Sequence, residues 1–358
     1  GRGEPGKSRW PINVGLTPPV KIWVACPKLD DLRQFHDGTK GLASGGGLIS
    51  TLLLPTTCGE REMLPRRRDV FPLSLRTLLA CVLLISSDVT VAAPPVFEIS
   101  AVDEKNECAT AAAVDVNGDG LLDILCGHYW YAAPDWKRHF ARDVQIIRGR
   151  FDDYSNLPLD VDGDGLTDIV SCNYRSQSIY WLKHPGDGSK PWMRTVIAEP
   201  GAMETGRLAD VDGDGRLDIL PNGTKFAAWW SVESNKATGP VWKRHDLPLE
   251  AAGHGIGFGD IDGDGRGDIV TPRGWFRAGE SPRTDRWKSM PEFRLHRDAG
   301  LPILVLDVDR DGDADIVWGR GHQTGLYWLE QRKDGADRTW LQHTIDTEVT
   351  QVHSLLLG

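Results

Sequence analysis

Five short acidic segments hold the residues of this sequence that are best suited to chemistry. Each reads D-x-[DN]-x-D-G-x-x-D and continues into Ile and a second aliphatic residue. Side-chain oxygens at positions 1, 3, 5 and 9, with a backbone carbonyl at position 7, suit Ca²⁺, which takes about 6–8 oxygen ligands, and glycine at position 6 permits a sharp turn. The pattern therefore predicts one calcium ion per loop. The predicted ligands are Asp115, Asn117, Asp119, Asp123, Asp160, Asp162, Asp164, Asp168, Asp210, Asp212, Asp214, Asp218, Asp260, Asp262, Asp264, Asp268, Asp307, Asp309, Asp311 and Asp315.

The loops differ from the helix–loop–helix type of calcium site. That site needs a glutamate at position 12. The residues found there are Cys126, Ser171, Pro221, Thr271 and Trp318. Each loop instead runs from its ninth residue into a β-branched and aliphatic segment, which favours a strand. We therefore expect strand–loop–strand calcium sites; the alternative, a solvated acidic turn, does not explain five copies.

The loops recur with a fixed period, which predicts a repeat architecture. They begin at Asp115, Asp160, Asp210, Asp260 and Asp307, about 45–50 residues apart. The third repeat is expected to hold four strands, over residues 205–209, 217–221, 226–232 and 242–247. Four short strands in a repeat of this length are typical of one blade of a β-propeller.

Aromatic residues recur in step with the loops. Buried packing between blades explains them most simply, because large rings stabilise most when buried; sugar stacking by some of them is the alternative. The pairs are Tyr129-Trp130, Tyr180-Trp181, Trp229-Trp230, Trp275-Phe276 and Tyr327-Trp328, and a later Trp follows as Trp136, Trp192, Trp242, Trp287 and Trp340. Four histidines are expected at equivalent places in the outer strands, and this repetition favours a structural role; they are His139, His245, His296 and His343.

Together, the loops and the aromatic pairs resemble the FG-GAP/VCBS family of calcium-binding β-propellers over about residues 94–358. The resemblance implies an all-β fold of four-stranded blades, with five loop-bearing repeats present. Because the family commonly has seven blades, we expect a truncated seven-bladed ring. The segment Val352 to Gly358 is similar to Gly253 to Gly259, which precedes the fourth loop, so a sixth loop is expected to follow it. Residues 97–100 are expected to form an outer strand that closes the ring.

The residues before the repeats have a different character. Arg66, Arg67 and Arg68 precede an apolar stretch from Leu75 to Ser87, and small residues follow at 91–93. This order is typical of a secretory signal peptide over residues 63–93. Residues 1–62 are then expected to be disordered upstream translation, and the protein to be secreted, periplasmic or on the cell surface. A membrane anchor is the alternative; after cleavage we expect no stable membrane insertion.

Charge narrows the range of partners. The formal net charge is −10, and the loops hold 19 aspartates, so the acidity lies in the predicted metal sites. The sequence has no basic stripe or aromatic-basic module, and we expect no nucleic-acid partner. We expect an extracellular protein or carbohydrate instead. The mature part keeps Cys108, Cys126 and Cys172, which we expect to be small buried residues.

Polar residues that do not repeat are the candidate ligand site. His254 and His353 precede a real or implied loop by six residues, and Glu204 has the same place before Asp210. This position opens the innermost strand, at the end opposite the loops. Further polar residues fall between the second and third strands, at the same end, where ligand sites form on propellers. The candidate ligand-binding residues are Glu204, His254, His353, His128, His322, Arg175 and Arg273; the alternative is an ordinary polar surface.

Two classes of function follow. The first is a secreted calcium-binding module for carbohydrate or protein. The second is the propeller part of a carbohydrate-active enzyme, a lyase or dehydratase, because the stretches around His254 and Trp275 are similar to those of aldos-2-ulose dehydratase-like proteins. In such an enzyme a metal and histidines would assist removal of a proton beside a carbonyl. No catalytic residue is assigned from the sequence.

Overall fold

The computed structural model describes most of the chain that follows residue 100. The described residues are 101–108, 110–235, 238–300, 302–334 and 337–357, together with the backbone of β1 (Ile22–Val24). The predicted signal peptide and the expected outer strand at residues 97–100 lie outside the described residues, as does the upstream segment except for β1.

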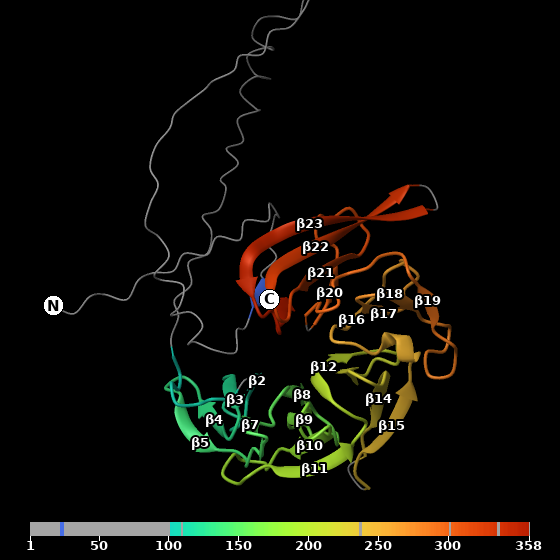
Figure 1. Ribbon diagram of the computed structural model, residues 1–358. Helices are drawn as coiled ribbons and strands as arrows, with labels where there is room; N and C mark the ends of the chain where they lie inside the picture. The colour runs from blue at the N-terminus through green and yellow to red at the C-terminus, as the bar shows by residue number, and fades with distance from the viewer. Residues whose placement is uncertain are drawn as a thin grey trace, which may run out of the picture. The chain divides into compact units, whose positions relative to one another are not determined.

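Twenty strands form five four-stranded antiparallel sheets, each built from consecutive strands (Figure 1). The first holds β2 (Ala111–Val114), β3 (Asp123–Cys126), β4 (Tyr129–Ala132) and β5 (Lys137–Phe140). The second holds β8 (Leu157–Leu159), β9 (Asp168–Cys172), β10 (Ile179–Lys183) and β11 (Met193–Ala198). The third holds β12 (Met203–Ala209), β13 (Asp218–Gly223), β14 (Ala228–Glu233) and β15 (Val241–Asp246). The fourth holds β16 (Gly257–Gly259), β17 (Asp268–Thr271), β18 (Gly274–Arg277) and β19 (Lys288–Met290), and the fifth holds β20 (Leu304–Leu306), β21 (Asp315–Gly319), β22 (Thr324–Asp334) and β23 (Asp337–Thr350).

The acidic loops join the first two strands of every sheet. In each sheet the second strand begins at the ninth loop residue, as β13 begins at Asp218. The strand–loop–strand prediction is therefore confirmed. All four strands predicted for the third repeat are present, with ends shifted by one or two residues. The fold is all-β in the described residues, which contain no α-helix and one short 3₁₀ helix, Leu249–Ala251.

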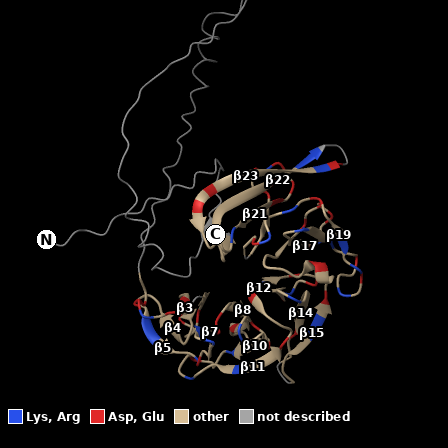
Figure 2. Cartoon of the chain, viewed as in Figure 1, with Lys and Arg blue, Asp and Glu red and all other residues tan. Residues whose placement is uncertain are grey.

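Two small sheets and one long hairpin complete the described strands. β6 (Ile146–Ile147) pairs with β7 (Arg150–Phe151), and β24 (Leu355–Leu357) pairs with β1. β22 and β23 continue beyond the other strands of their sheet, and charged residues lie at the far end of this hairpin (Figures 1 and 2). Among the residues that the structure describes, no helix is long and apolar enough to cross a membrane.

The core lies between successive sheets. One hydrophobic cluster joins the third and fourth sheets around Trp229, and a second joins the second and third sheets around Trp230. Adjacent residues of a strand point to opposite faces, so one aromatic pair serves both neighbouring sheets. Tyr180 and Trp181 divide in the same way, toward the first and third sheets. The predicted packing role of the pairs is confirmed at these positions.

Three of the four repeating histidines stack on a tryptophan of their own sheet. Ring centroids lie 4.4 Å apart for His139 and Trp130 and 4.0 Å apart for His245 and Trp229. His343 stacks on Trp328 in the same way, at 4.4 Å. The expectation is wrong for His296, because the outer strand β19 ends at Met290 and His296 follows it, in contact with Asp298.

Removing one aromatic from an interface between sheets should cost far more than removing an exposed one. Trp229 is fully buried, whereas Trp136 is 38% exposed. We expect Trp229→Ala to lower the free energy of unfolding by about 3–5 kcal/mol, because it leaves a cavity between two sheets. The control Trp136→Ala should cost less than about 1 kcal/mol. Urea denaturation measures both; equal losses would contradict the packing described.

Candidate functional site

The acidic loops are held in shape by their own backbone. In the second loop, Gly163 and Gly165 donate N–H groups to the two carboxylate oxygens of Asp160, at 2.9 and 3.0 Å. Leu166 donates its N–H to Asp164, at 2.9 Å. The other loops repeat much of this network. Because the first and fifth positions are fixed in this way, the backbone preorganises their carboxylates.

The ninth-position aspartate is buried and ties the loop to the sheet. Asp168 is fully buried; it accepts hydrogen bonds from the N–H of Val161, at 3.2 Å, and of His184, at 2.7 Å. Val161 lies at the start of the loop and His184 follows the third strand, so one carboxylate joins two distant segments. Asp123, Asp268 and Asp315 make the same two contacts in their own sheets.

Four loops bring three carboxylates close enough to share a cation. In each group, one oxygen from each residue lies within 4.8 Å of the others. The groups are Asp160, Asp162 and Asp168; Asp210, Asp212 and Asp218; Asp260, Asp262 and Asp268; and Asp307, Asp309 and Asp311. The first loop forms no such group among the described residues; its third position is Asn117. These donor sets fit Ca²⁺, which prefers hard oxygen ligands. Moreover, Asp262 has a buried oxygen with no hydrogen-bond partner in the described structure.

Basic side chains reach the third and fifth positions, which the sequence did not suggest. Lys183 contacts Asp162 and Asp164, and Arg277 contacts Asp262 at 2.7 Å and Asp264 at 2.9 Å. In the third loop the cation is Arg283, from the fourth repeat, which contacts Asp212 and Asp214. Each of these cations partly neutralises carboxylates that repel one another. A calcium ion in one of these loops would therefore compete with a basic side chain for the same oxygens.

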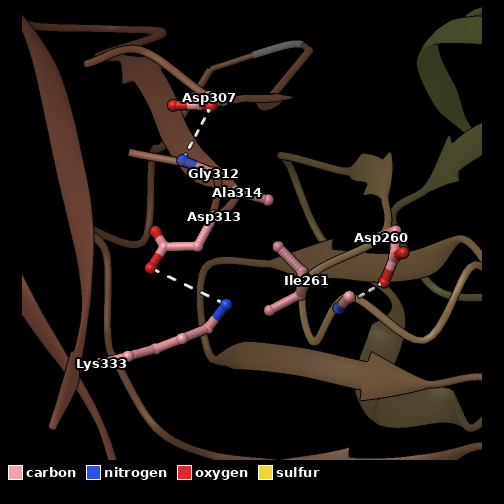
Figure 3. Close-up of a pocket in the computed structure, with 8 residues that line it drawn as sticks. Asp260, Ile261, Asp307, Gly312, Asp313, Ala314 and Lys333 are labelled. Carbon is pink, nitrogen blue, oxygen red and sulfur yellow. Dashed lines mark hydrogen bonds and ion pairs between the residues drawn. The ribbon is translucent and has the colours of Figure 1, made fainter. Parts of the chain in front are cut away.

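A cavity of about 230 Å³ lies between the fourth and fifth loops. Figure 3 shows Asp260 and Asp307, the first residues of the two loops, at its sides. Lys333 lies 3.9 Å from Asp313, the seventh residue of the fifth loop. The cavity is therefore bordered by residues of two predicted metal loops and one cation.

A second group of polar residues gathers at the other end of the inner strands. Glu204 is the second residue of β12, and His254 precedes β16. His322 lies between β21 and β22, and His353 follows β23. Each of the four offers a ligand atom within 4.8 Å of the others. Glu204 Oε2 and His254 Nε2 are 2.9 Å apart. Four predicted residues from three sheets and the segment after β23 thus come together, and we call them the Glu–His cluster.

Neighbouring groups hold two members of the Glu–His cluster in place. The buried amide of Asn222 accepts hydrogen bonds from the N–H groups of Glu204 and Thr205, at 2.9 and 2.8 Å, and donates one to the carbonyl of His254, at 2.8 Å. Sequence reasoning missed Asn222, because an asparagine within a strand carries no distinctive signal. His254 Nδ1 lies 3.1 Å from the carbonyl oxygen of Ala299.

The charges of the Glu–His cluster are coupled. Burial alone would raise the pKa of Glu204, but the hydrogen bond with His254 and the nearby imidazoles hold that pKa below its usual value. Burial opposes protonation of His254 as well, yet Glu204 raises the pKa of this imidazole. Burial lowers the pKa of His353. The arrangement therefore favours one ion pair, with His353 neutral beside it.

The remaining predicted ligand residues lie outside the Glu–His cluster. His128 contacts the carbonyl of Arg142 through Nδ1, at 3.2 Å. Arg273 is exposed and donates to the carbonyl of Ala252, at 2.7 Å. Arg175 donates through Nε to the hydroxyl of Tyr154, at 3.2 Å, and its guanidinium lies 5.5 Å from the ring of Tyr174. Sequence reasoning did not single out Tyr174.

Part of the chain matches a known family. Residues 160–220, which begin at the second loop and end in β13, match the family model of the FG-GAP-like repeat. The predicted resemblance is confirmed for this segment. No curated protein sequence matches the chain.

Solved structures with a similar arrangement also exist. One is a lectin from Agrocybe aegerita that recognises non-reducing terminal N-acetylglucosamine, with 16% identity and a TM-score of 0.41, covering 66% of this chain and 65% of the lectin chain. Another is the biofilm matrix protein Bap1 of V. cholerae, with 18% identity and a TM-score of 0.37, covering 65% of this chain and 39% of that chain. The chain thus spans less than two thirds of either protein.

The buried ninth aspartate should matter more than the exposed fifth one. In EDTA, we expect Asp168→Ala to lower the free energy of unfolding by about 2–5 kcal/mol, because two buried N–H groups lose their acceptor. The control Asp164→Ala removes an exposed carboxylate and should cost less than about 1 kcal/mol. Chemical denaturation of both variants measures the difference. A larger loss for Asp164→Ala would contradict this account.

The stabilisation by calcium should grow with pH. Burial raises the pKa of Asp168 and Asp315 to about 6 and that of Asp218 and Asp268 to about 7, whereas an aspartate in the unfolded chain titrates near about 3.9. Without metal the folded protein therefore holds protons that the unfolded chain has released, and its stability falls as pH rises from about 4 to about 7. Ca²⁺ binds the ionised carboxylates, so its effect increases over the same range.

Melting temperatures in EDTA and in saturating Ca²⁺ test this expectation at pH 5.5 and pH 8. Each filled site adds about 2.7 kcal/mol at a hundredfold excess over Kd. We expect a clear increase with Ca²⁺ at pH 8, a smaller one at pH 5.5, and less from Mg²⁺ at either. Equal melting temperatures in EDTA and Ca²⁺ at pH 8 would exclude the calcium assignment.

Proposed function

We propose that this protein is a calcium-binding β-propeller module that works outside the cell and binds carbohydrate. The five sheets are its blades, since repeated four-stranded sheets packed face to face are the units of a propeller. The convergent carboxylates in four loops support bound calcium. The total of seven blades that the resemblance implies stays a prediction.

The observation that supports ligand binding most directly is a fixed aromatic and basic group, Tyr154, Tyr174 and Arg175. The two tyrosine rings are partly exposed, and their centroids lie 6.0 Å apart. Tyr154 precedes its calcium loop by six residues, as Glu204 does, so the group lies at the end of the second sheet opposite the loop. We call these three residues the Tyr–Arg group.

The turn that carries the Tyr–Arg group is preorganised. The buried carboxylate of Asp152 accepts hydrogen bonds from the N–H groups of Arg175 and Ser176, at 3.2 and 3.0 Å. The side chain of Asn173 accepts a hydrogen bond from the N–H of Tyr154, at 3.2 Å, and the backbone N–H of Asn173 donates one to the carbonyl of Ser178. A turn fixed at both ends loses little entropy when a ligand binds, which favours affinity.

Carbohydrate is the ligand class that this chemistry fits. Aromatic faces pack against the apolar faces of sugar rings, and a tyrosine offers a polar hydroxyl beside its ring. A guanidinium forms paired hydrogen bonds with a carboxylate, so Arg175 suits a uronate or another acidic sugar. These residues are sufficient for a carbohydrate-binding site, and binding alone needs no catalytic group.

An extracellular location accords with both the metal and the sequence. Loops of modest affinity fill at the millimolar calcium found outside cells, and competing cations such as Lys183 and Arg283 lower affinity further. Export through the signal-like segment at residues 63–93, with a mature chain that starts near Pro94, is part of the same proposal.

Binding to oligosaccharides at saturating Ca²⁺ tests the proposal. We expect wild type to bind uronate-containing sugars, and Tyr174→Ala and Arg175→Ala to weaken binding at least about tenfold. A hydrogen bond to a charged group contributes about 1.5–3 kcal/mol, and about 1.4 kcal/mol is a factor of ten. The measurement is calorimetry on sugars first selected from a glycan array.

Lys243→Ala is the matched control, because it removes one exposed charge from the outer strand β15. This variant should bind as wild type does. Unchanged binding by Tyr174→Ala and Arg175→Ala, at unchanged melting temperature, would place the site elsewhere. Binding of an extracellular protein but of no sugar would replace carbohydrate with protein in the proposal.

A further inference from the structure

We propose that the Glu–His cluster is a binding site for one divalent transition-metal ion, of which Zn²⁺ is the best representative. The site would be separate from the calcium loops and from the Tyr–Arg group. Its ligands would be Glu204, His254, His322 and His353. Three imidazoles and one carboxylate are the ligand types that zinc takes in proteins, whereas calcium prefers oxygen alone.

The four side chains are close enough for this role. The imidazole centroids are 4.8 Å apart for His254 and His322, 5.2 Å for His322 and His353, and 5.8 Å for His254 and His353. A tetrahedral zinc ion with bonds of about 2.0–2.1 Å holds its ligand atoms about 3.4 Å apart. The ligand atoms here lie within 4.8 Å of one another, so shifts of about an ångström would complete the site.

Hydrogen bonds direct the correct nitrogen of two histidines to the centre. His254 Nδ1 contacts the carbonyl oxygen of Ala299, and His353 Nδ1 contacts that of Gln351, both at 3.1 Å. A carbonyl accepts only, so each Nδ1 carries a proton and each Nε2 is the nitrogen left to bind a metal. At His254 the metal would displace the proton that Nε2 shares with Glu204. This contact to the second ring nitrogen is the usual companion of a histidine that ligates a metal.

Of the four proposed ligands, His322 makes the fewest other interactions. Its side chain is exposed, and neither of its ring nitrogens hydrogen-bonds another described residue. A structural histidine would show a stacking or hydrogen-bonding partner, as His139 and His245 do with their tryptophans. The aromatic rings that contact His322 in the described structure are instead the two other imidazoles of the cluster.

The backbone around the cluster leaves room for it. A Cβ placed on Gly321 would lie 2.4 Å from Cε1 of His254, so glycine lets this imidazole pass against the neighbouring turn. On the other side, Asn222 holds the backbones of Glu204 and His254 together.

Two atoms inside the cluster lack other partners. Glu204 Oε2 and His254 Nε2 are shielded from solvent and have no hydrogen-bonding partner beyond their own ion pair. A cation placed between these atoms would satisfy both.

Zinc titration of the full chain at saturating Ca²⁺ tests the proposal, because calcium keeps the acidic loops filled. We expect one Zn²⁺ per chain by calorimetry and a higher melting temperature with Zn²⁺. Bound Co²⁺ should give the visible absorption of a nitrogen-ligated site. His322→Ala should weaken Zn²⁺ binding at least tenfold without loss of stability, since this exposed ring has no other hydrogen-bonding partner described. Glu204→Gln, which keeps the side-chain shape, should weaken it as well.

His296→Ala is the matched control, because His296 is an exposed histidine that pairs with Asp298 outside the cluster. It should bind Zn²⁺ as wild type does. Equal Zn²⁺ binding by His322→Ala, Glu204→Gln and wild type would overturn the proposal, as would no Zn²⁺ binding by the wild-type protein. Sugar binding is measured separately with the Tyr–Arg variants, so failure of either proposal leaves the other standing.

Discussion

The buried carboxylate at the ninth position of each loop is the contact on which the rest of this structure depends. Asp123, Asp168, Asp268 and Asp315 each accept one backbone hydrogen bond from the start of a loop and one from the third strand or the residue after it, and Asp218 accepts the first of these. Burial of a carboxylate costs free energy unless it is hydrogen-bonded. The same group therefore anchors the loop to its sheet. In the second, third and fourth repeats the same side chain also belongs to a group of three carboxylates close enough to share a cation, so one residue serves both folding and the proposed metal site.

The two ends of the inner strands carry different kinds of residues. At one end the sequence repeats, and so does the chemistry, with aspartates that gather oxygen ligands in four loops. At the other end the residues vary from sheet to sheet, and so do the sites, with Tyr154 and Tyr174 on the second sheet and Glu204 on the third. Buried residues such as Asn222 and Asp152 stabilise this end as well, whereas Tyr154, Tyr174 and Glu204 are only partly buried. These partly buried side chains can follow the demands of a ligand.

There is a physical reason why some features of the fold and the sites could be predicted from the sequence and others could not. The loops, the strand order and the packing of Trp229 and Trp230 follow local patterns that repeat, so they were predictable. Contacts between repeats were not, because they depend on how one sheet is placed against the next. Arg283 contacts Asp212 in the loop of the preceding repeat, and no spacing in the sequence predicts this contact. Glu204, His254 and His353 were grouped by register, but the separation of Arg175 from them needed the structure, as did the discovery of Asn222.

The alternating aromatic pairs have a consequence for how this protein comes apart. The second, third and fourth sheets each give one ring to the sheet before and one to the sheet after, so the free energy of each depends on its immediate neighbours. Such a chain of nearest-neighbour couplings behaves like a one-dimensional cooperative array. Damage to one sheet is then felt strongly by two others and weakly beyond them. The energetic unit of this molecule is therefore the interface between two sheets, and a single sheet has little stability of its own.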